Sequence, residues 1–300
     1  MRYVARAPLR IDFGGGWTDV PIYAEREGGA VLNAAITCYA RGSISRPEGI
    51  GLLRGLRSDR SYVSYSLDAP VGAGLGGSAA QTVVWAALVR TAMLNTASRR
   101  DIAEIAWGVG GLLGILGGKQ DEYASALGGI NFLSFGRDVN IETLSLPPTI
   151  LNDLRERLVL AYSGERRLSS DVHATVWERY TRGDPRVAGA LGQLKRVASD
   201  MKTALVRGDL DVFGSLLDEN WTHQKVLAPS ISSPGIEAIL QRARANGAEA
   251  GKACGAGGGG CVLLMAGNGR KPQLVEALRR GRVPIIDFDF DTYGVFLKKG

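Results

Sequence analysis

Residues 70–81 read Pro-Val-Gly-Ala-Gly-Leu-Gly-Gly-Ser-Ala-Ala-Gln, and this stretch carries more information about the fold than any other. Glycine has no Cβ, so a glycine-rich backbone can turn sharply and approach a ligand closely. Residues 79–88 are mostly apolar or helix-forming, which predicts that a buried helix begins here. A turn of this kind directs free N–H groups and the positive end of the helix dipole at the same space. The stretch therefore predicts an anion site, and the usual anion is a phosphate.

This glycine loop, residues 70–81, supplies the groups expected to contact the phosphates of a nucleotide. They are Gly72, Gly74, Leu75, Gly76, Gly77, Ser78 and Ala79. The Ser78 hydroxyl is placed to reach Mg²⁺, a role that Ser or Thr has in other phosphate loops. The loop has no Gly-Lys-Ser/Thr, which excludes a P-loop. No βαβ unit with an acidic residue about 20 positions further on is evident, which argues against a dinucleotide fingerprint. Taken alone, the glycines could also make a tight strand-to-helix turn that binds nothing.

Two further segments favour the ligand-binding interpretation. Residues 6–19 read Arg-Ala-Pro-Leu-Arg-Ile-Asp-Phe-Gly-Gly-Gly-Trp-Thr-Asp, and residues 251–265 place a glycine run between apolar residues. With the glycine loop between them, these segments resemble the three ordered motifs of the GHMP kinases, the family of galactokinase, homoserine kinase, mevalonate kinase and phosphomevalonate kinase. The resemblance extends from about Arg6 to the C-terminus. It implies ATP and Mg²⁺ as cofactors and phosphoryl transfer to a hydroxyl as the reaction.

Within this family the sequences of the motifs are most similar to those of the sugar kinases that act on heptose 7-phosphate and on fucose. The segments that carry this similarity are Gly-Gly-Trp-Thr-Asp-Val-Pro (15–21), Gly-Gly-Lys-Gln-Asp-Glu-Tyr (117–123), Tyr-Ser-Gly-Glu-Arg-Arg (162–167) and Asn-Trp-Thr-His-Gln-Lys (220–225). A small-molecule sugar or sugar phosphate is therefore the expected substrate, with D-glycero-D-manno-heptose 7-phosphate first and a fucose-like sugar second.

The chain pattern predicts an α+β fold with a boundary near 148–155, giving domains over 1–150 and 151–300. The resemblance implies an N-terminal half like the second domain of ribosomal protein S5 and a ferredoxin-like C-terminal half with extra helices. Expected strands cover 30–46, 62–68, 130–135, 157–162, 261–266, 284–289 and 292–298. Expected helices cover 76–94, 98–113, 119–127, 168–180, 186–206, 209–226, one beginning at Ser233-Pro234, and 272–281. Ser98 and Asp101 fit a capping box.

Composition narrows the class of protein. The chain has 300 residues, 45% hydrophobic and 22% charged, as in an ordinary globular enzyme. Its net charge of +6 comes from scattered basic residues, so nucleic acid is not expected as a partner. The two histidines and three cysteines lack metal-site spacing, which argues against zinc. The start of the sequence shows no leader pattern and no long apolar run follows, so a cytoplasmic protein without membrane contact is expected. The sequence leaves a homodimer open.

Phosphoryl transfer needs positioning, neutralisation of phosphate charge and a group that takes the hydroxyl proton. Asp121 is the candidate base because it opens a helix after a glycine hinge, and the matching Asp is the catalytic base in the family. Lys119 is expected to hold Asp121 ionised and to stabilise a nearby alkoxide. The alternative is that Asp121 only caps the helix. Arg10 matches a residue near the transferred phosphate in galactokinase-like enzymes, but it could instead pair with Asp12.

The resemblance also assigns substrate contacts. In related sugar kinases the residue matching Asp19 binds two sugar hydroxyls, although Asp19 could instead cap the helix that contains Pro21. The remaining candidates near the sugar are Gly16, Trp17, Thr18, Arg166, Gly257 and Gly258. The glycine run 255–260 requires a tight backbone approach, to a ligand or to the glycine loop. Arg166, Arg167 and Lys252 could contact a phosphate already on the sugar or could simply be solvated.

Three departures from the family pattern raise an alternative function. Gly77 stands where the family usually has a serine, and Val109 stands near the place of a glutamate that helps to hold Mg²⁺. Glu104 might compensate for that glutamate, but it lies at least a helical turn away. The segment 41–68, which helps to form the nucleotide pocket in relatives, is short. We therefore weigh an ATP-dependent sugar kinase against a catalytically weak, regulatory sugar- and nucleotide-binding protein on the same fold.

Overall fold

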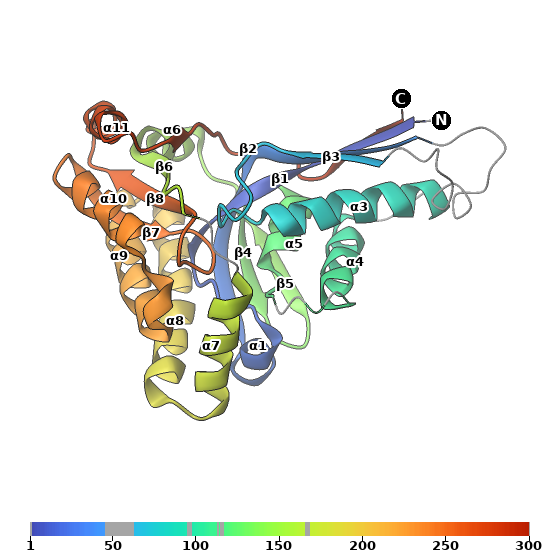
Figure 1. Ribbon diagram of the computed structural model, residues 1–300, viewed down its shortest axis with the longest axis horizontal. Coiled ribbons are helices and arrows are strands. Elements are labelled where there is room, and N and C mark those ends of the chain that lie inside the picture. The colour runs from blue at the N-terminus through green and yellow to red at the C-terminus, as the bar shows by residue number, and fades with distance from the viewer. Residues whose placement is uncertain are drawn as a thin grey trace.

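The computed structural model describes residues 2–45, 63–94, 98–112, 114, 117–165 and 169–299. Within these residues the chain forms two antiparallel sheets with helices packed on them (Figure 1). The first has six strands in the order β10-β1-β2-β4-β5, with β3 paired to another part of β2. The second has four strands in the order β7-β8-β6-β9. The α+β fold predicted from the sequence is therefore confirmed.

The first sheet is built on two long strands, β1 (Arg2–Gly14) and β2 (Gly29–Ser45). They pair antiparallel, and Arg10 of β1 lies opposite Ala35 of β2. From Ala7 onward every residue of β1 is buried, because helices from both halves of the chain contact this strand. The remaining strands are β3 (Val63–Leu67), β4 (Ile130–Phe135), β5 (Val139–Thr143) and β10 (Phe296–Lys299).

Four helices accompany this sheet: α1 (Pro21–Glu27), α3 (Gly77–Leu94), α4 (Arg99–Leu112) and α5 (Gln120–Leu127). Both α3 and α5 contact β1, so their N-terminal turns lie near its central residues. The capping box before α4 is confirmed, because the Asp101 N–H donates to Ser98 Oγ and the Ser98 N–H donates to Asp101 Oδ2, both at 3.1 Å.

The second sheet consists of β6 (Leu158–Tyr162), β7 (Ala248–Ala253), β8 (Cys261–Ala266) and β9 (Ile285–Ile286). Its helices are α6 (Pro148–Arg157), α7 (Ser169–Thr181), α8 (Pro185–Arg207), α9 (Leu210–Leu227), α10 (Pro234–Arg244) and α11 (Lys271–Arg280), with a 3-10 turn at Pro229–Ile231. Ser233 caps α10 by accepting the Ile236 N–H, as expected. Phe13 of β1 meets Phe213 of α9 edge to face at 5.3 Å, which joins the two halves in one core.

Some elements differ from the sequence prediction. The boundary predicted near 148–155 falls within α6, which begins at Pro148, a position where proline is well tolerated. Strand β5 was not expected, and β9 is shorter than the predicted 284–289. The last strand, β10, pairs with β1 in the first sheet, and Figure 1 shows the two side by side. The division at about residue 150 stays a prediction, and residues 296–299 complete the sheet of the N-terminal half.

Candidate active site

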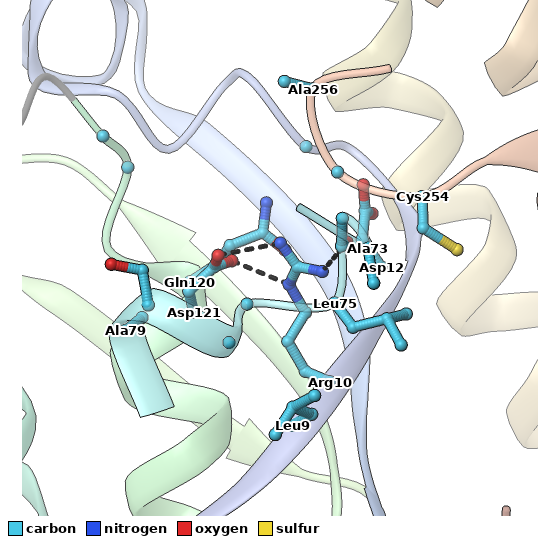
Figure 2. A pocket seen from close by; sticks show the side chains of 18 of the residues that line it. Leu9, Arg10, Asp12, Ala73, Leu75, Ala79, Gln120, Asp121, Cys254 and Ala256 are labelled. Carbon is cyan, nitrogen blue, oxygen red and sulfur yellow. Dashed lines mark hydrogen bonds and ion pairs between the residues drawn. The ribbon is translucent and has the colours of Figure 1, made fainter. Parts of the chain in front are cut away.

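A pocket of about 380 Å³ lies where the three sequence motifs meet. It is lined by β1, the glycine loop, the first turn of α5 and the glycine run after β7. Figure 2 shows side chains from these segments facing one another, although Arg10 and Asp121 are 111 positions apart in the sequence. The volume is within the range of small-molecule sites.

The glycine loop requires its glycines. Gly72, Gly74 and Gly76 have φ values of +78°, +74° and +70°, a region that favours glycine, and α3 begins directly afterwards at Gly77. A Cβ on Gly74 would lie 2.6 Å from the carbonyl oxygen of Cys254. All seven residues predicted to contact phosphate, from Gly72 to Ala79, line the pocket.

The glycine run 255–260 supports this loop through direct backbone contact. The Cys261 N–H donates to the Ala73 carbonyl at 2.8 Å, and a Cβ on Gly255 would lie 2.8 Å from the Gly74 carbonyl oxygen. Side chains larger than hydrogen would push the two segments apart. The tight approach predicted for this run therefore occurs between it and the glycine loop.

Arg10 is paired with Asp121 and not with Asp12. Its Nε and Nη2 donate to the two carboxylate oxygens of Asp121 at 2.7 and 2.8 Å, and its Nη1 donates to the Gly74 carbonyl at 2.6 Å. Burial lowers the pKa of Arg10, but the charge and hydrogen bonds of Asp121 outweigh it, so the net shift is upward. The bidentate geometry fixes the Asp121 carboxylate against the glycine loop.

Lys119 does not have the role expected from its place in the sequence. Its Nζ pairs with Glu104 at 2.9 Å and lies 4.4 Å from the centre of the Trp107 ring, and it does not line the pocket. Tyr123 also donates to Glu104. Because α5 begins between them, Lys119 and Asp121 point in different directions, and the cation beside Asp121 is Arg10. Glu104 is therefore engaged by Lys119 and Tyr123, and it does not line the pocket.

Asp121 does not cap its helix, because it lies in the first turn of α5 with its carboxylate on Arg10. The group at that helix start is Asp19, whose Oδ2 accepts the Gln120 N–H at 3.0 Å. Asp19 therefore caps α5 and not α1, whose N-cap is Val20. Burial, opposed by the Gln120 hydrogen bond, raises the pKa of Asp19 to about 7. A Cβ on Gly118 would overlap the Asp19 carboxylate, so glycine is needed there.

Other predicted substrate contacts divide into two groups. Gly16, Trp17, Asp19 and Gly257 line the pocket. Thr18 does not, because its buried hydroxyl bonds to Gly15 and Ala30 and holds the motif together. Gly258 does not either, since its N–H donates to the Ile231 carbonyl at 2.6 Å. Arg166 and Arg167 lie outside the described residues.

Lys252 is buried, so the alternative of surface solvation is wrong for this residue. Its Nζ donates to the Asp12 carboxylate at 3.1 Å and to the Asp12 carbonyl at 3.0 Å. This pair ties β7 to β1 beneath the pocket, so Lys252 does not reach a substrate phosphate.

Several pocket residues keep polar atoms without partners among the described residues. They are three oxygens, Asp12 Oδ1, Gln120 Oε1 and Glu122 Oε2, and one N–H donor, Trp17 Nε1. Buried polar atoms are normally hydrogen-bonded, so atoms of this kind at a pocket indicate a ligand or water. Burial raises the pKa of Glu122 well above its usual range, with the Asp121 charge adding to the effect.

Gln120, Glu122 and His173 are pocket residues that sequence reasoning did not select. The first two flank Asp121 in a segment already noted, and a polar pair beside a candidate base was a usable signal. A lone histidine gave no such signal. Within the described chain no group of three or more His, Cys, Asp or Glu could hold a metal ion, and no described helix has the length and apolar character needed to cross a bilayer.

Comparisons with known proteins agree with this geometry. The family "GHMP kinases N terminal domain" matches residues 46–129 and "GHMP kinases C terminal" matches 201–282, together more than half of the chain. A D-glycero-alpha-D-manno-heptose 7-phosphate kinase from Campylobacter jejuni is 29% identical, over 97% of each chain. A bifunctional fucokinase/GDP-fucose pyrophosphorylase from Arabidopsis thaliana is 25% identical, over 95% of this chain and 32% of that protein.

The fold is also found in solved structures. The crystal structure of a D-glycero-D-manno-heptose 1-phosphate kinase from Bacteroides thetaiotaomicron superposes with a TM-score of 0.78 at 24% identity, covering 99% of each chain. The three motifs meet at one pocket, and both family halves are matched in order. This chain therefore belongs to the GHMP kinases.

Proposed function

We propose that the protein is an ATP-dependent sugar kinase that transfers the γ-phosphate to a hydroxyl of a sugar or sugar phosphate. D-glycero-D-manno-heptose 7-phosphate is the first candidate substrate and a fucose-like sugar the second, on the names of the relatives. The observation that carries the proposal is the position of Asp121. Its carboxylate is fixed by Arg10, and an ideal Cβ at Gly76 of the glycine loop would lie only 3.2 Å from its Oδ2.

In this proposal the glycine loop and the N-terminus of α3 bind the β- and γ-phosphates through N–H groups. Asp121 accepts the proton of the attacking hydroxyl, whose oxygen forms the new bond to the γ-phosphorus. The bond from that phosphorus to the bridging oxygen breaks, and ADP leaves. Arg10 keeps positive charge beside the developing alkoxide, because it is held by both Asp121 and Gly74.

A magnesium ion would reach this site with ATP. Mg²⁺ keeps several water ligands and is commonly held by substrate phosphates with few protein groups. Ser78, exposed at the start of α3 and lining the pocket, is the residue that fits this role. The ion would neutralise phosphate charge. Glu104 does not line the pocket, and its carboxylate accepts hydrogen bonds from Lys119 and Tyr123, which makes Ser78 the better candidate.

The acceptor side of the pocket suits a polyol. Asp12, Gln120 and Glu122 line the pocket and each has an oxygen without a partner, and sugar hydroxyls, which both donate and accept, could bond to them. Asp19 has one oxygen on the Gln120 N–H, which leaves the other for a sugar hydroxyl. We further propose that the protein works in the cytoplasm, where ATP and sugar phosphates are found, and that it has no nucleic-acid partner.

The test is ADP release, coupled to pyruvate kinase and lactate dehydrogenase, over a panel of heptose phosphates, heptoses, fucose and other hexoses. Sugar-dependent ADP release with a phosphorylated product in the mass spectrum supports the proposal. A folded protein that binds ATP and a sugar but releases no ADP on the panel would favour the regulatory binding protein instead.

A further inference from the structure

His173 on α7 belongs to an aromatic cluster at the edge of the pocket. Its ring packs against Trp17 with centroids 4.4 Å apart and planes tilted by 32°. Trp177, one turn further along α7, donates from Nε1 to His173 Nδ1 at 3.3 Å. Trp17 also packs on Trp177 at 6.0 Å. The histidine ring is therefore fixed by contacts on its face and at one nitrogen.

The contact with Trp177 determines where the imidazole carries its proton. An indole N–H can only donate, so Nδ1 must accept. In a neutral imidazole the other nitrogen then carries the hydrogen, which makes Nε2–H a donor. Burial lowers the pKa of His173 to about 4, although the charge of Asp121 opposes that shift. At neutral pH the residue is an uncharged donor of defined orientation.

That donor has no partner among the residues that the structure describes. His173 lines the pocket, and the residue is only partly buried. Trp17 is held at φ +82°, a strained conformation for a bulky residue, and this conformation places its ring against His173. Strain of this kind persists where the surrounding structure enforces it, and it is common at ligand sites.

We propose that His173 binds the sugar by donating its Nε2–H to a substrate oxygen in the pocket that Asp12, Gln120 and Glu122 also line. The pocket then offers a fixed donor as well as acceptors. Directional hydrogen bonds, and not ion pairs, would orient a polyol there. The inference rests on the proposed function for the identity of the ligand, but the tautomer and orientation of His173 do not depend on turnover.

The experiment compares His173→Phe, which keeps an aromatic ring against Trp17 but removes both nitrogens, with the wild type. His223→Gln is the matched control, because His223 is the only other histidine and pairs with Glu219 on α9. Steady-state kinetics are measured with ADP release. The expected result is a rise of about 3- to 10-fold in the sugar KM, the range of one net hydrogen bond, with kcat and the ATP KM little changed.

A second readout is independent of catalysis. Nitrogen-15 NMR of the histidines reports the protonated nitrogen of each ring, and sugars are titrated without ATP. We expect an Nε2–H tautomer for His173, a shift of its resonance when the sugar binds, and no shift for His223. A positively charged His173 at pH 7, or a ring protonated at Nδ1, would overturn the inference.

The outcomes separate the two proposals. Turnover by the wild type with an unchanged sugar KM in His173→Phe rejects the His173 inference and leaves the kinase proposal standing. Without turnover on any sugar, the kinase proposal fails and the NMR titration decides: a sugar that shifts His173 and binds more weakly to His173→Phe supports the inference. No sugar-induced shift rejects it.

Discussion

Replacing Asp121 by asparagine tests the base assignment, and the structure indicates a cost in stability as well. The carboxylate accepts two hydrogen bonds from Arg10, at 2.7 and 2.8 Å, and Arg10 is only 4% exposed. Asparagine keeps one acceptor oxygen but presents an NH₂ group, a donor, to the second guanidinium N–H. The substitution therefore removes the proton acceptor and leaves part of a buried cation without its partner.

The two effects have different magnitudes. Loss of a general base lowers kcat by about 10²- to 10⁴-fold, which corresponds to roughly 3–5 kcal/mol of barrier. Breaking a buried ion pair completely costs about 3–5 kcal/mol of stability. Asparagine retains one hydrogen bond and the Asp121 side chain is 26% exposed, so water can reach it. We expect the free energy of unfolding to fall by about 1–3 kcal/mol.

The assay combines urea unfolding with kcat at saturating sugar and ATP, at a temperature where the variant is folded. Glu249→Gln is the matched control. Arg157 is also buried and lies away from the pocket. It donates to Glu249 at 2.6 Å, to the Ala266 carbonyl at 3.0 Å and to Asp211 at 2.8 Å, so the variant leaves it one carboxylate partner. The control should lose stability without losing kcat. A folded Asp121→Asn protein with kcat within threefold of the wild type would refute the base assignment.

Three further substitutions give separate checks. Asp19→Asn keeps the cap on α5 but cannot titrate. Because the folded-state pKa of Asp19 is raised from 3.8 to about 7, wild-type stability should decline between about pH 4 and 7, by up to about 4 kcal/mol relative to the variant, and should level off at higher pH. Parallel pH profiles of urea unfolding for the two proteins would contradict this prediction. Gly74→Ala places a Cβ 2.6 Å from the Cys254 carbonyl oxygen at a residue with φ +74°. We therefore expect ATP affinity to fall and the free energy of unfolding to fall by at least about 1–3 kcal/mol. A variant with the unfolding and ATP titration curves of the wild type would contradict the loop geometry. Gly77→Ser restores the family serine, and its Cβ would lie 3.1 Å from the flexible Leu67 side chain. The free energy of unfolding should therefore change by less than about 1 kcal/mol. A larger loss of stability in calorimetry would show that this glycine is structural.

Sequence reasoning succeeded where the interaction is local or the backbone dictates the residue. The Ser98–Asp101 box joins residues three positions apart, and its geometry follows from helix ends alone. The glycines of the loop are required by positive φ values, which glycine adopts most readily. Both features can be predicted because they do not depend on what the rest of the chain does.

Pairings across long separations could not be chosen from the sequence. From the sequence, Asp12 on the same strand was a possible partner for Arg10. In the structure Arg10 pairs with Asp121, and Asp12 pairs with Lys252. Lys119 was selected for its closeness in sequence to Asp121, which does not imply a shared direction at a helix start. Strand β7 contains a glycine and a lysine and so lacks the apolar alternation typical of a strand. Its lysine can be buried in the sheet because it forms an ion pair with Asp12.

The most direct test of the account is transfer itself, followed by ³¹P NMR with ATP, Mg²⁺ and D-glycero-D-manno-heptose 7-phosphate. The account predicts that the γ-phosphate signal of ATP decreases as ADP and a second sugar-phosphate signal appear, and that Asp121→Asn slows both changes by the same factor of about 10²–10⁴. If the wild-type protein binds ATP but forms no phosphorylated product from this or any other sugar on the panel, the assignment of this pocket to phosphoryl transfer is contradicted.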